Sequence, residues 1–209
     1  MQLKVAPINH FTMEKLNNKN TVIQVEINEI PKMTFRIFSI LIFTIILPFV
    51  VLHSDMLSLI IDDLSAIFRE SHFLYLFRLM WVALVFILVV ILGIVLHEAI
   101  HALFFSFFLP SKFRGVEFGF NKDHGIPFVH IKEPISVLGF RIGAIMPLII
   151  LGILPAALGL YSGYLSLTAF GVLFTISASG DLLLITRTRS LPSTQKIKDL
   201  PDKIGFELV

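Results

Sequence analysis

The feature that most constrains this chain is a cluster of ionisable residues inside a long apolar segment. Residues 81–96 contain no charged side chain, His97-Glu98-Ala99-Ile100-His101 follows directly, and residues 102–105 are again apolar. About 20 apolar residues are enough for a helix to cross a bilayer. An ionisable group near the centre of such a span costs about 2.5–3.5 kcal/mol. Three such groups in one span therefore need a compensating partner, and a metal ion supplies one.

The spacing of the three residues fits a metal site. Positions i and i+4 lie on one face of a helix, about 6 Å apart along its axis, so His97 and His101 can both direct an imidazole at one ion. Glu98 lies beside that ion, where it can accept a proton from water. The pattern His-Glu-x-x-His is typical of zinc metalloproteases. The alternative is a chance match in which the histidines bond to neighbouring helices, but ionisable groups within a span favour a functional site.

The composition of the chain indicates a polytopic membrane protein in the cell membrane. Of its 209 residues 56% are hydrophobic and 15% are charged, and the mean hydropathy is +0.86. No basic block with interleaved aromatic residues is present, so we expect no nucleic-acid partner. The chain contains no cysteine, so a metal ion must be bound by His, Asp or Glu.

Apolar segments and basic loops predict an all-α membrane protein with a small cytoplasmic β-hairpin. Lys and Arg are concentrated before the first span, between the second and third, and after the fourth, so both termini are expected in the cytoplasm. Residues 55–69 predict an amphipathic helix in the outer loop. The four predicted spans are about 35–52, 73–109, 139–161 and 164–185, and the hairpin is about 113–132. The predicted parts are a cytoplasmic tail (1–33), a membrane metalloprotease-like domain (34–186) and a second cytoplasmic tail (187–209).

The hairpin is predicted from an alternating pattern. Val116, Phe118 and Phe120 alternate with Gly and Glu, a polar turn follows, and residues 126–132 favour an extended strand. The hairpin has two interpretations: it caps the end of the bundle, or its free edge captures an extended substrate by strand addition. Residues 21–27 could add a further strand.

A catalytic zinc site needs a third protein ligand and leaves one position for water. Asp181 is the best candidate because it lies in the fourth span, at about the depth of the two histidines, after a run of small residues that permits close helix packing. The alternative is an acid at a helix end, paired with Arg187 or Arg189. The remaining candidates are the loop residues Asp123, His124, His130 and Glu133.

Three separated blocks of this chain resemble a known family. They are His97–His101, the stretch from His130 through Glu133 to Arg141 and Pro147, and Ser179-Gly180-Asp181. Together they look like the bacterial membrane proteins of the putative zincin peptidase family, which are similar in plan to site-2 intramembrane proteases. The resemblance covers about residues 80–186. It implies a core of three helices, with zinc (Zn2+) held by His97, His101 and Asp181, and with Glu98 catalytic. The chain departs from site-2 proteases at the third ligand, because they commonly present it as Leu-Asp-Gly or Asn-Pro-Asp-Gly.

The expected function is zinc-dependent hydrolysis of peptide bonds within or next to the membrane, by a zinc-activated water with Glu98 as general base. The expected partners are the lipid bilayer and a membrane-embedded or juxtamembrane peptide substrate. The alternative is a non-proteolytic membrane protein, such as an immunity, sensing or transport factor, that retains a structural metal site. The accessory candidates are His130, Glu133 and Arg141, and substrate binding is expected at the hairpin near Val116, Phe118 and Phe120.

Overall fold

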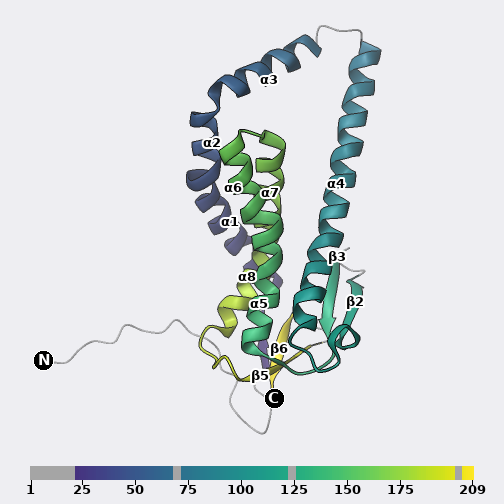
Figure 1. Ribbon diagram of the computed structural model, residues 1–209, viewed down its shortest axis with the longest axis vertical. Coiled ribbons are helices and arrows are strands. Elements are labelled where there is room, and N and C mark those ends of the chain that lie inside the picture. Colours follow the sequence, from purple (N-terminus) through teal and green to yellow (C-terminus); the bar gives the residue numbers. More distant parts are fainter. Residues whose placement is uncertain (1–21, 68–71, 122–125, 201–203) are drawn as a thin grey trace, which may run out of the picture.

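The computed structural model describes residues 22–67, 72–121, 126–200 and 204–209. Within these residues a helical bundle stands on two small β-sheets (Figure 1). The helices are η1 (Ile27–Glu29), α1 (Ile30–Leu41), η2 (Ile42–Ile46), α2 (Leu47–Leu52), α3 (Ser54–Ile67), α4 (His72–Ser106), η3 (Lys112–Gly115), α5 (Val137–Pro147), η4 (Leu148–Ile153), α6 (Leu154–Ser162), α7 (Leu165–Ser177) and α8 (Ser179–Thr188). The strands are β1 (Val22–Gln24), β2 (Val116–Asn121), β3 (Ile126–Ile131), β4 (Ile135–Ser136), β5 (Lys196–Asp199) and β6 (Gly205–Leu208).

Within the described residues, three helical segments are long and apolar enough to cross a membrane, as expected of a multi-pass membrane protein: Ile30–Leu52, Leu74–Ser106 and Val137–Ser162. A fourth crossing results if α7 and α8, which meet at a 44° bend, form one broken span. The three segments overlap the first three spans expected from hydropathy, and the bent pair overlaps the fourth. The number four, and the cytoplasmic placement of the termini, remain predictions.

Proline and small residues shape the other helices of the bundle, from η2 to α7. The π-helical segments η2 and η4 each end just before a proline, Pro48 and Pro155. Proline lacks an N–H, so the regular hydrogen-bond ladder is interrupted there. Helices α6 and α7 approach closely through glycine: a Cβ at Gly159 would lie 2.4 Å from the backbone nitrogen of Thr168. The segment Val137–Ser162 therefore contains a π-helical turn between two α-helices.

Helix α4 stands apart from the bundle along most of its length (Figure 1). Nearly every side chain between Leu74 and Leu92 is exposed, whereas the part after Gly93 packs against α5. There the ring of Phe105 lies against Gly143, where a Cβ would come within 2.2 Å of it. Helix α3 connects α2 to α4 at the far end, where a helix was predicted over residues 55–69. Its place on the outer side of the membrane remains a prediction.

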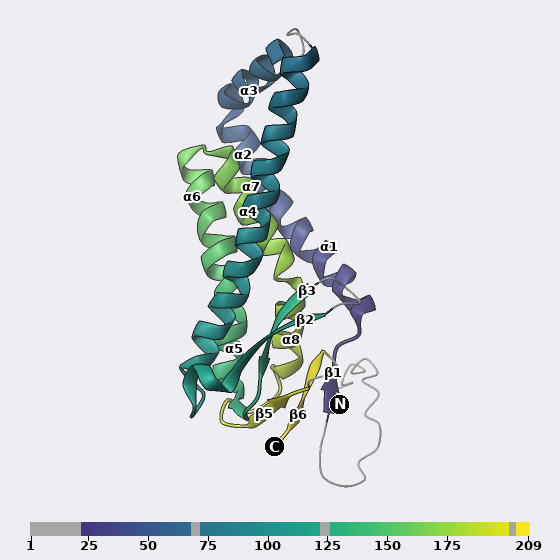
Figure 2. The ribbon, with the colours of Figure 1, turned by 90° about the vertical axis from the view of Figure 1, so that its right-hand side faces the viewer.

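The hairpin forms as expected, with β2 paired to β3 in the register Val116↔Ile131 to Asn121↔Ile126. It lies beside the lower part of α4 (Figure 2). A second sheet, with strand order β1-β6-β5-β4, was not expected. It takes strands from both segments interpreted as tails, and β1 pairs with β6 rather than with the hairpin.

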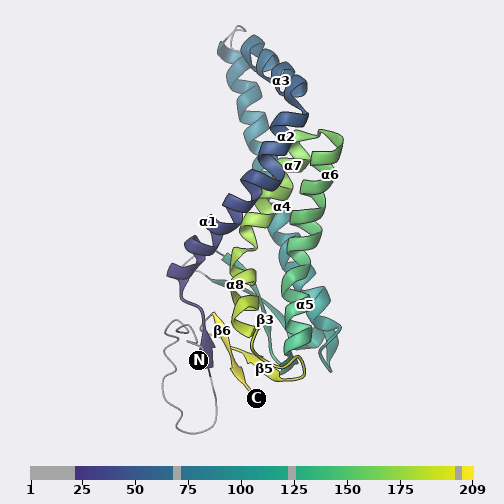
Figure 3. The ribbon, with the colours of Figure 1, turned by 90° about the vertical axis from the view of Figure 1, so that its left-hand side faces the viewer.

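The four-stranded sheet lies at the same end of the molecule as the hairpin, and α1 runs obliquely past α7 and α8 above it (Figure 3). Between the two sheets and the lower ends of α4 and α5 is the hydrophobic core. Its members include Ala102, Phe105, Val116, Ile131, Ile135, Val137, Phe140, Ile197 and Phe206. The core therefore holds the hairpin and the sheet against the end of α4 that contains the His-Glu-x-x-His motif.

Candidate metal centre

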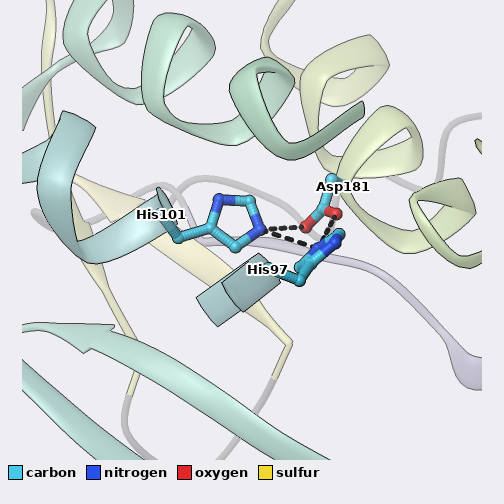
Figure 4. Close-up of side chains that lie close together, drawn as sticks. All are labelled: His97, His101 and Asp181. Carbon is cyan, nitrogen blue, oxygen red and sulfur yellow. Dashed lines mark hydrogen bonds and ion pairs between the residues drawn. The ribbon is translucent and has the colours of Figure 1, made fainter. Parts of the chain in front are cut away.

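His97 and His101 project from successive turns of α4 and meet Asp181, in the first turn of α8 (Figure 4). The Nε2 atom of His97 lies 3.1 Å from Oδ2 of Asp181, and Nε2 of His101 lies 3.3 Å from Oδ1. The two Nε2 atoms are 3.2 Å apart. Both histidines are buried, at 8% and 5% exposure. The structure thus brings the three expected ligands together from two separate helices.

The chemistry of this group fits a zinc ion. The Nδ1 of His101 donates a hydrogen bond to the carbonyl of Gly143 at 3.0 Å. In a neutral ring this leaves Nε2 with a lone pair that faces a carboxylate oxygen and another imidazole nitrogen. Such acceptors repel one another unless a proton or a cation lies between them. Ligand atoms around a tetrahedral zinc are about 3.3 Å apart, because each bond is about 2.0–2.1 Å long, and the observed separations of 3.1–3.3 Å agree.

The bend between α7 and α8 positions Asp181. Helix α7 ends at Ser177, and Ala178 and Ser179, which follow, are almost completely buried. The hydroxyl of Thr34 in α1 donates to the hydroxyl of Ser179 at 2.9 Å. Gly180 has open space at its Cβ position, so it is not a point of close helix approach.

The close approach of α7 to α4 occurs instead at Gly93. A Cβ there would lie 2.1 Å from Cζ of Phe174, a ring that is 2% exposed. Helix α4 continues through Gly93 as one helix. The role of Gly93 is to admit the aromatic ring one turn before His97.

Glu98 is partly buried beside the metal group, with which it interacts electrostatically. Its carboxylate also faces the backbone N–H of Val129 in β3. The N–H of Lys132, just after β3, bonds to the carbonyl of Gly115, just before β2. In an antiparallel ladder alternate residues pair with the partner strand, so Val129 and Ile131 direct their backbone groups away from β2. We call these outward groups of Val129 and Ile131, with the carbonyl of Pro127, the free edge of β3.

The three accessory candidates lie in other contacts. His130 Nδ1 is 2.8 Å from Oδ2 of Asp199. Glu133 accepts hydrogen bonds from the hydroxyl and backbone N–H of Ser111, and so holds the loop after α4. Arg141 donates to Thr188 and to the carbonyl of Leu191 at the end of α8, a place where a cation is favourable. The structure brings none of the three into the metal group, and Asp123 and His124 lie outside the described residues.

The expected substrate-binding residues divide into two kinds. Val116 is buried in the core, whereas Phe118 and Phe120 are 64% and 60% exposed. The two rings thus extend the apolar face of the hairpin beyond the core.

Asp199, whose carboxylate contacts the hairpin, was not identified from the sequence. Burial raises the pKa of its carboxyl, although bonds from Ile131 and His130 oppose the rise. A signal was available: Lys196, Ile197, Lys198 and Asp199 alternate as a strand, which places the acid on the same face as the buried Ile197.

Comparison with known proteins places this chemistry in a family. No curated protein and no solved structure matches the chain. Residues 90–195, just over half of the chain, match the model of the family described as "Putative zincin peptidase". This range contains the motif on α4, the hairpin, α5 to α7 and Asp181 on α8. The chain therefore belongs to the putative zincin peptidase family.

Proposed function

We propose that this protein is a zinc-dependent peptidase that cleaves peptide bonds within or next to the membrane, with Glu98 as general base. The observation that supports it best is the convergence of His97, His101 and Asp181 beside Glu98 on a membrane-spanning helix. The family description agrees with a metallopeptidase. A bound zinc ion supplies Lewis-acid polarisation of the scissile carbonyl and lowers the pKa of water.

The residues of the chain have separate tasks in this proposal. His97, His101 and Asp181 hold the ion, and the carbonyl of Gly143 keeps the His101 ring in the tautomer whose Nε2 faces the group. Glu98 accepts the proton of the attacking water and delivers it to the leaving nitrogen. The low exposure of both histidines keeps bulk water away, which strengthens these electrostatic interactions.

The substrate must be extended at the bond that is cut, since a helix shields its own carbonyl groups. The free edge of β3 has no neighbouring strand among the described residues, and an extended peptide can pair with its outward carbonyls next to Glu98 as an added strand. Phe118 and Phe120 provide apolar surface on the same hairpin for a peptide that leaves the bilayer. The proposed substrate is therefore a membrane-embedded or juxtamembrane segment.

The alternative, a non-proteolytic protein with a structural metal, predicts a different ligand set. Structural zinc sites are closed by four protein ligands, whereas catalytic sites use three and leave one position open. Among the described residues the group has three members, which favours catalysis.

The test uses full-length protein purified in detergent micelles, with zinc measured by mass spectrometry and cleavage followed on fluorescein-labelled casein. We expect about one zinc per chain and cleavage by the wild type. Glu98→Gln should keep its zinc and lose about 10²–10⁴-fold in rate, the usual contribution of a general base. Cleavage by this variant at the wild-type rate would remove the assignment of Glu98, and wild-type protein without zinc would remove the metal centre.

A further inference from the structure

Asp199 is an acid on an apolar surface. It ends β5 on the inner face of the four-stranded sheet, where Ile197 on the same strand is 1% exposed. Phe206, which lies opposite Asp199 on β6, is 2% exposed. A carboxylate in such a place is costly unless hydrogen bonds satisfy it. Its Oδ2 accepts from two neighbouring groups of β3, Nδ1 of His130 at 2.8 Å and the backbone N–H of Ile131 at 3.2 Å. One carboxylate therefore links the sheet built from both ends of the chain to the hairpin.

The N–H of Ile131 belongs to the free edge of β3, the edge that Glu98 also meets. Glu98 faces the N–H of Val129, two residues away. Two residues of a strand span about 7 Å and point the same way. Two carboxylates from distant parts of the chain thus lie against successive outward groups of one strand.

We propose that Asp199 is a positioning residue for the reaction, because it holds the free edge of β3 in place against Glu98. The proposal rests on the proposed function. Bonded to Asp199, the N–H of Ile131 is not available to a substrate strand. The N–H of Val129 faces Glu98, so an added peptide pairs first with the outward carbonyls of Pro127 and Val129, directly beside Glu98. Asp199 in this way ends the edge and sets the register in which a substrate lies.

The experiment compares Asp199→Ala, Asp199→Ser and Asp199→Asn in full-length, zinc-loaded protein. Alanine removes the acceptor, and serine retains a polar group that is too short to reach β3. Asparagine keeps the shape and an oxygen that can accept both bonds. The matched control is Glu117→Gln, which removes a carboxylate from the hairpin where Glu117 pairs with Lys132 at 3.5 Å. The readouts are amide hydrogen exchange of segment 126–132, zinc content, and kcat and KM for fluorescein-labelled casein.

We expect Asp199→Ala and Asp199→Ser to exchange the amides of segment 126–132 about tenfold faster, since local opening becomes easier. Their kcat should fall about ten- to hundredfold, because a misplacement of about 1 Å at a reacting group can cost about 100-fold in rate. Their KM should change less, and their zinc content should stay complete. Asp199→Asn should recover most of both losses. Glu117→Gln should match the wild type.

Unchanged exchange in the alanine and serine variants would overturn the proposal, as would faster exchange with an unchanged kcat. Failure of asparagine to restore either quantity would also contradict it. If the Asp199→Ala variant does not fold, the exchange rate and kcat of Asp199→Ser provide the same test. The exchange measurement does not depend on peptide cleavage. Wild-type protein that cleaves no casein would therefore contradict the proposed function, and slow exchange in all variants would separately contradict the contact.

Discussion

The two parts of α4 belong to one continuous helix but lie in opposite surroundings. From Leu74 to Leu92 the side chains are exposed on every side of the helix. After Gly93 the helix contacts α5, α7 and the hairpin, and it buries His97 and His101. One continuous helix therefore has a largely exposed part and a packed part, which carries two of the three candidate metal ligands.

This difference shows what small residues and polar groups do in an apolar span. A helix that is apolar all round is stable either inside a protein or in a lipid bilayer, and the first part of α4 fits the bilayer. Between helices in lipid no hydrophobic force acts, so association depends on close packing and polar contacts. Gly93, Gly143 and the metal group provide these in the second part only. The predictions below test this contrast, beginning with the largest expected effect.

Removing the ligand that joins α4 to α8 should have the largest effect. We expect Asp181→Asn to lower zinc affinity by more than about 100-fold, because even residues that only support ligands are worth 10–100-fold. The measurement is zinc content after dialysis against a chelator. Glu133→Gln is the matched control and should keep its zinc, since Glu133 contacts Ser111. If Glu133→Gln lost its zinc and Asp181→Asn kept it, Glu133 would be the ligand, and the metal centre would not include α8.

Enlarging a small residue should separate the two parts of α4 directly. Gly93→Leu forces a side chain into Phe174, where even a Cβ would be 2.1 Å from the ring. We expect a loss of about 1–3 kcal/mol in the free energy of unfolding, as is usual for overpacking. Ala83→Leu makes a similar change in the exposed part and should stay within about 0.5 kcal/mol of wild type. Unfolding in mixed micelles measures both, and equal losses would show that the exposed part packs against protein.

The smallest expected effect is the pH dependence of Asp199, at the end of the core that supports the second part of α4. Burial raises the pKa of this carboxyl in the folded protein. The folded state then binds the proton more tightly than the unfolded state, and stability falls as pH rises from the ordinary value of 3.8 through the raised one. Asp199→Asn lacks this titration. Thermal unfolding between about pH 3.5 and about pH 7 should show wild type losing stability relative to the variant, and a constant difference would contradict the raised pKa.

Much of this arrangement was visible in the sequence. Helical spacing alone placed His97 and His101 on one face of α4, and period-two alternation predicted the hairpin that contains Phe118 and Phe120. Both are patterns within a few residues of chain, where backbone geometry determines which side chains are neighbours. Asp181 was found because a carboxylate within an apolar segment is costly and few others were available.

The four-stranded sheet was not predicted, because its strands are short and their partners are far apart in the chain. Val22 pairs with Glu207, and Ile135 with Ile197. Strands of two to four residues contain too few alternations to be recognised, and their pairing depends on burial against neighbours. The contacts of His130, Glu133 and Arg141 also join residues 22 to 69 positions apart.

The sequence by itself determined the apolar spans, the histidine pair and the acidic group beside them, since these follow from the length of a span, the pitch of a helix and the cost of charge in lipid. Only the tertiary structure decided which carboxylates meet the hairpin and which part of α4 is packed. Those outcomes depend on where Gly93, Gly143 and Asp199 come to lie once distant segments pack together, and packing between distant segments leaves no local pattern in the chain.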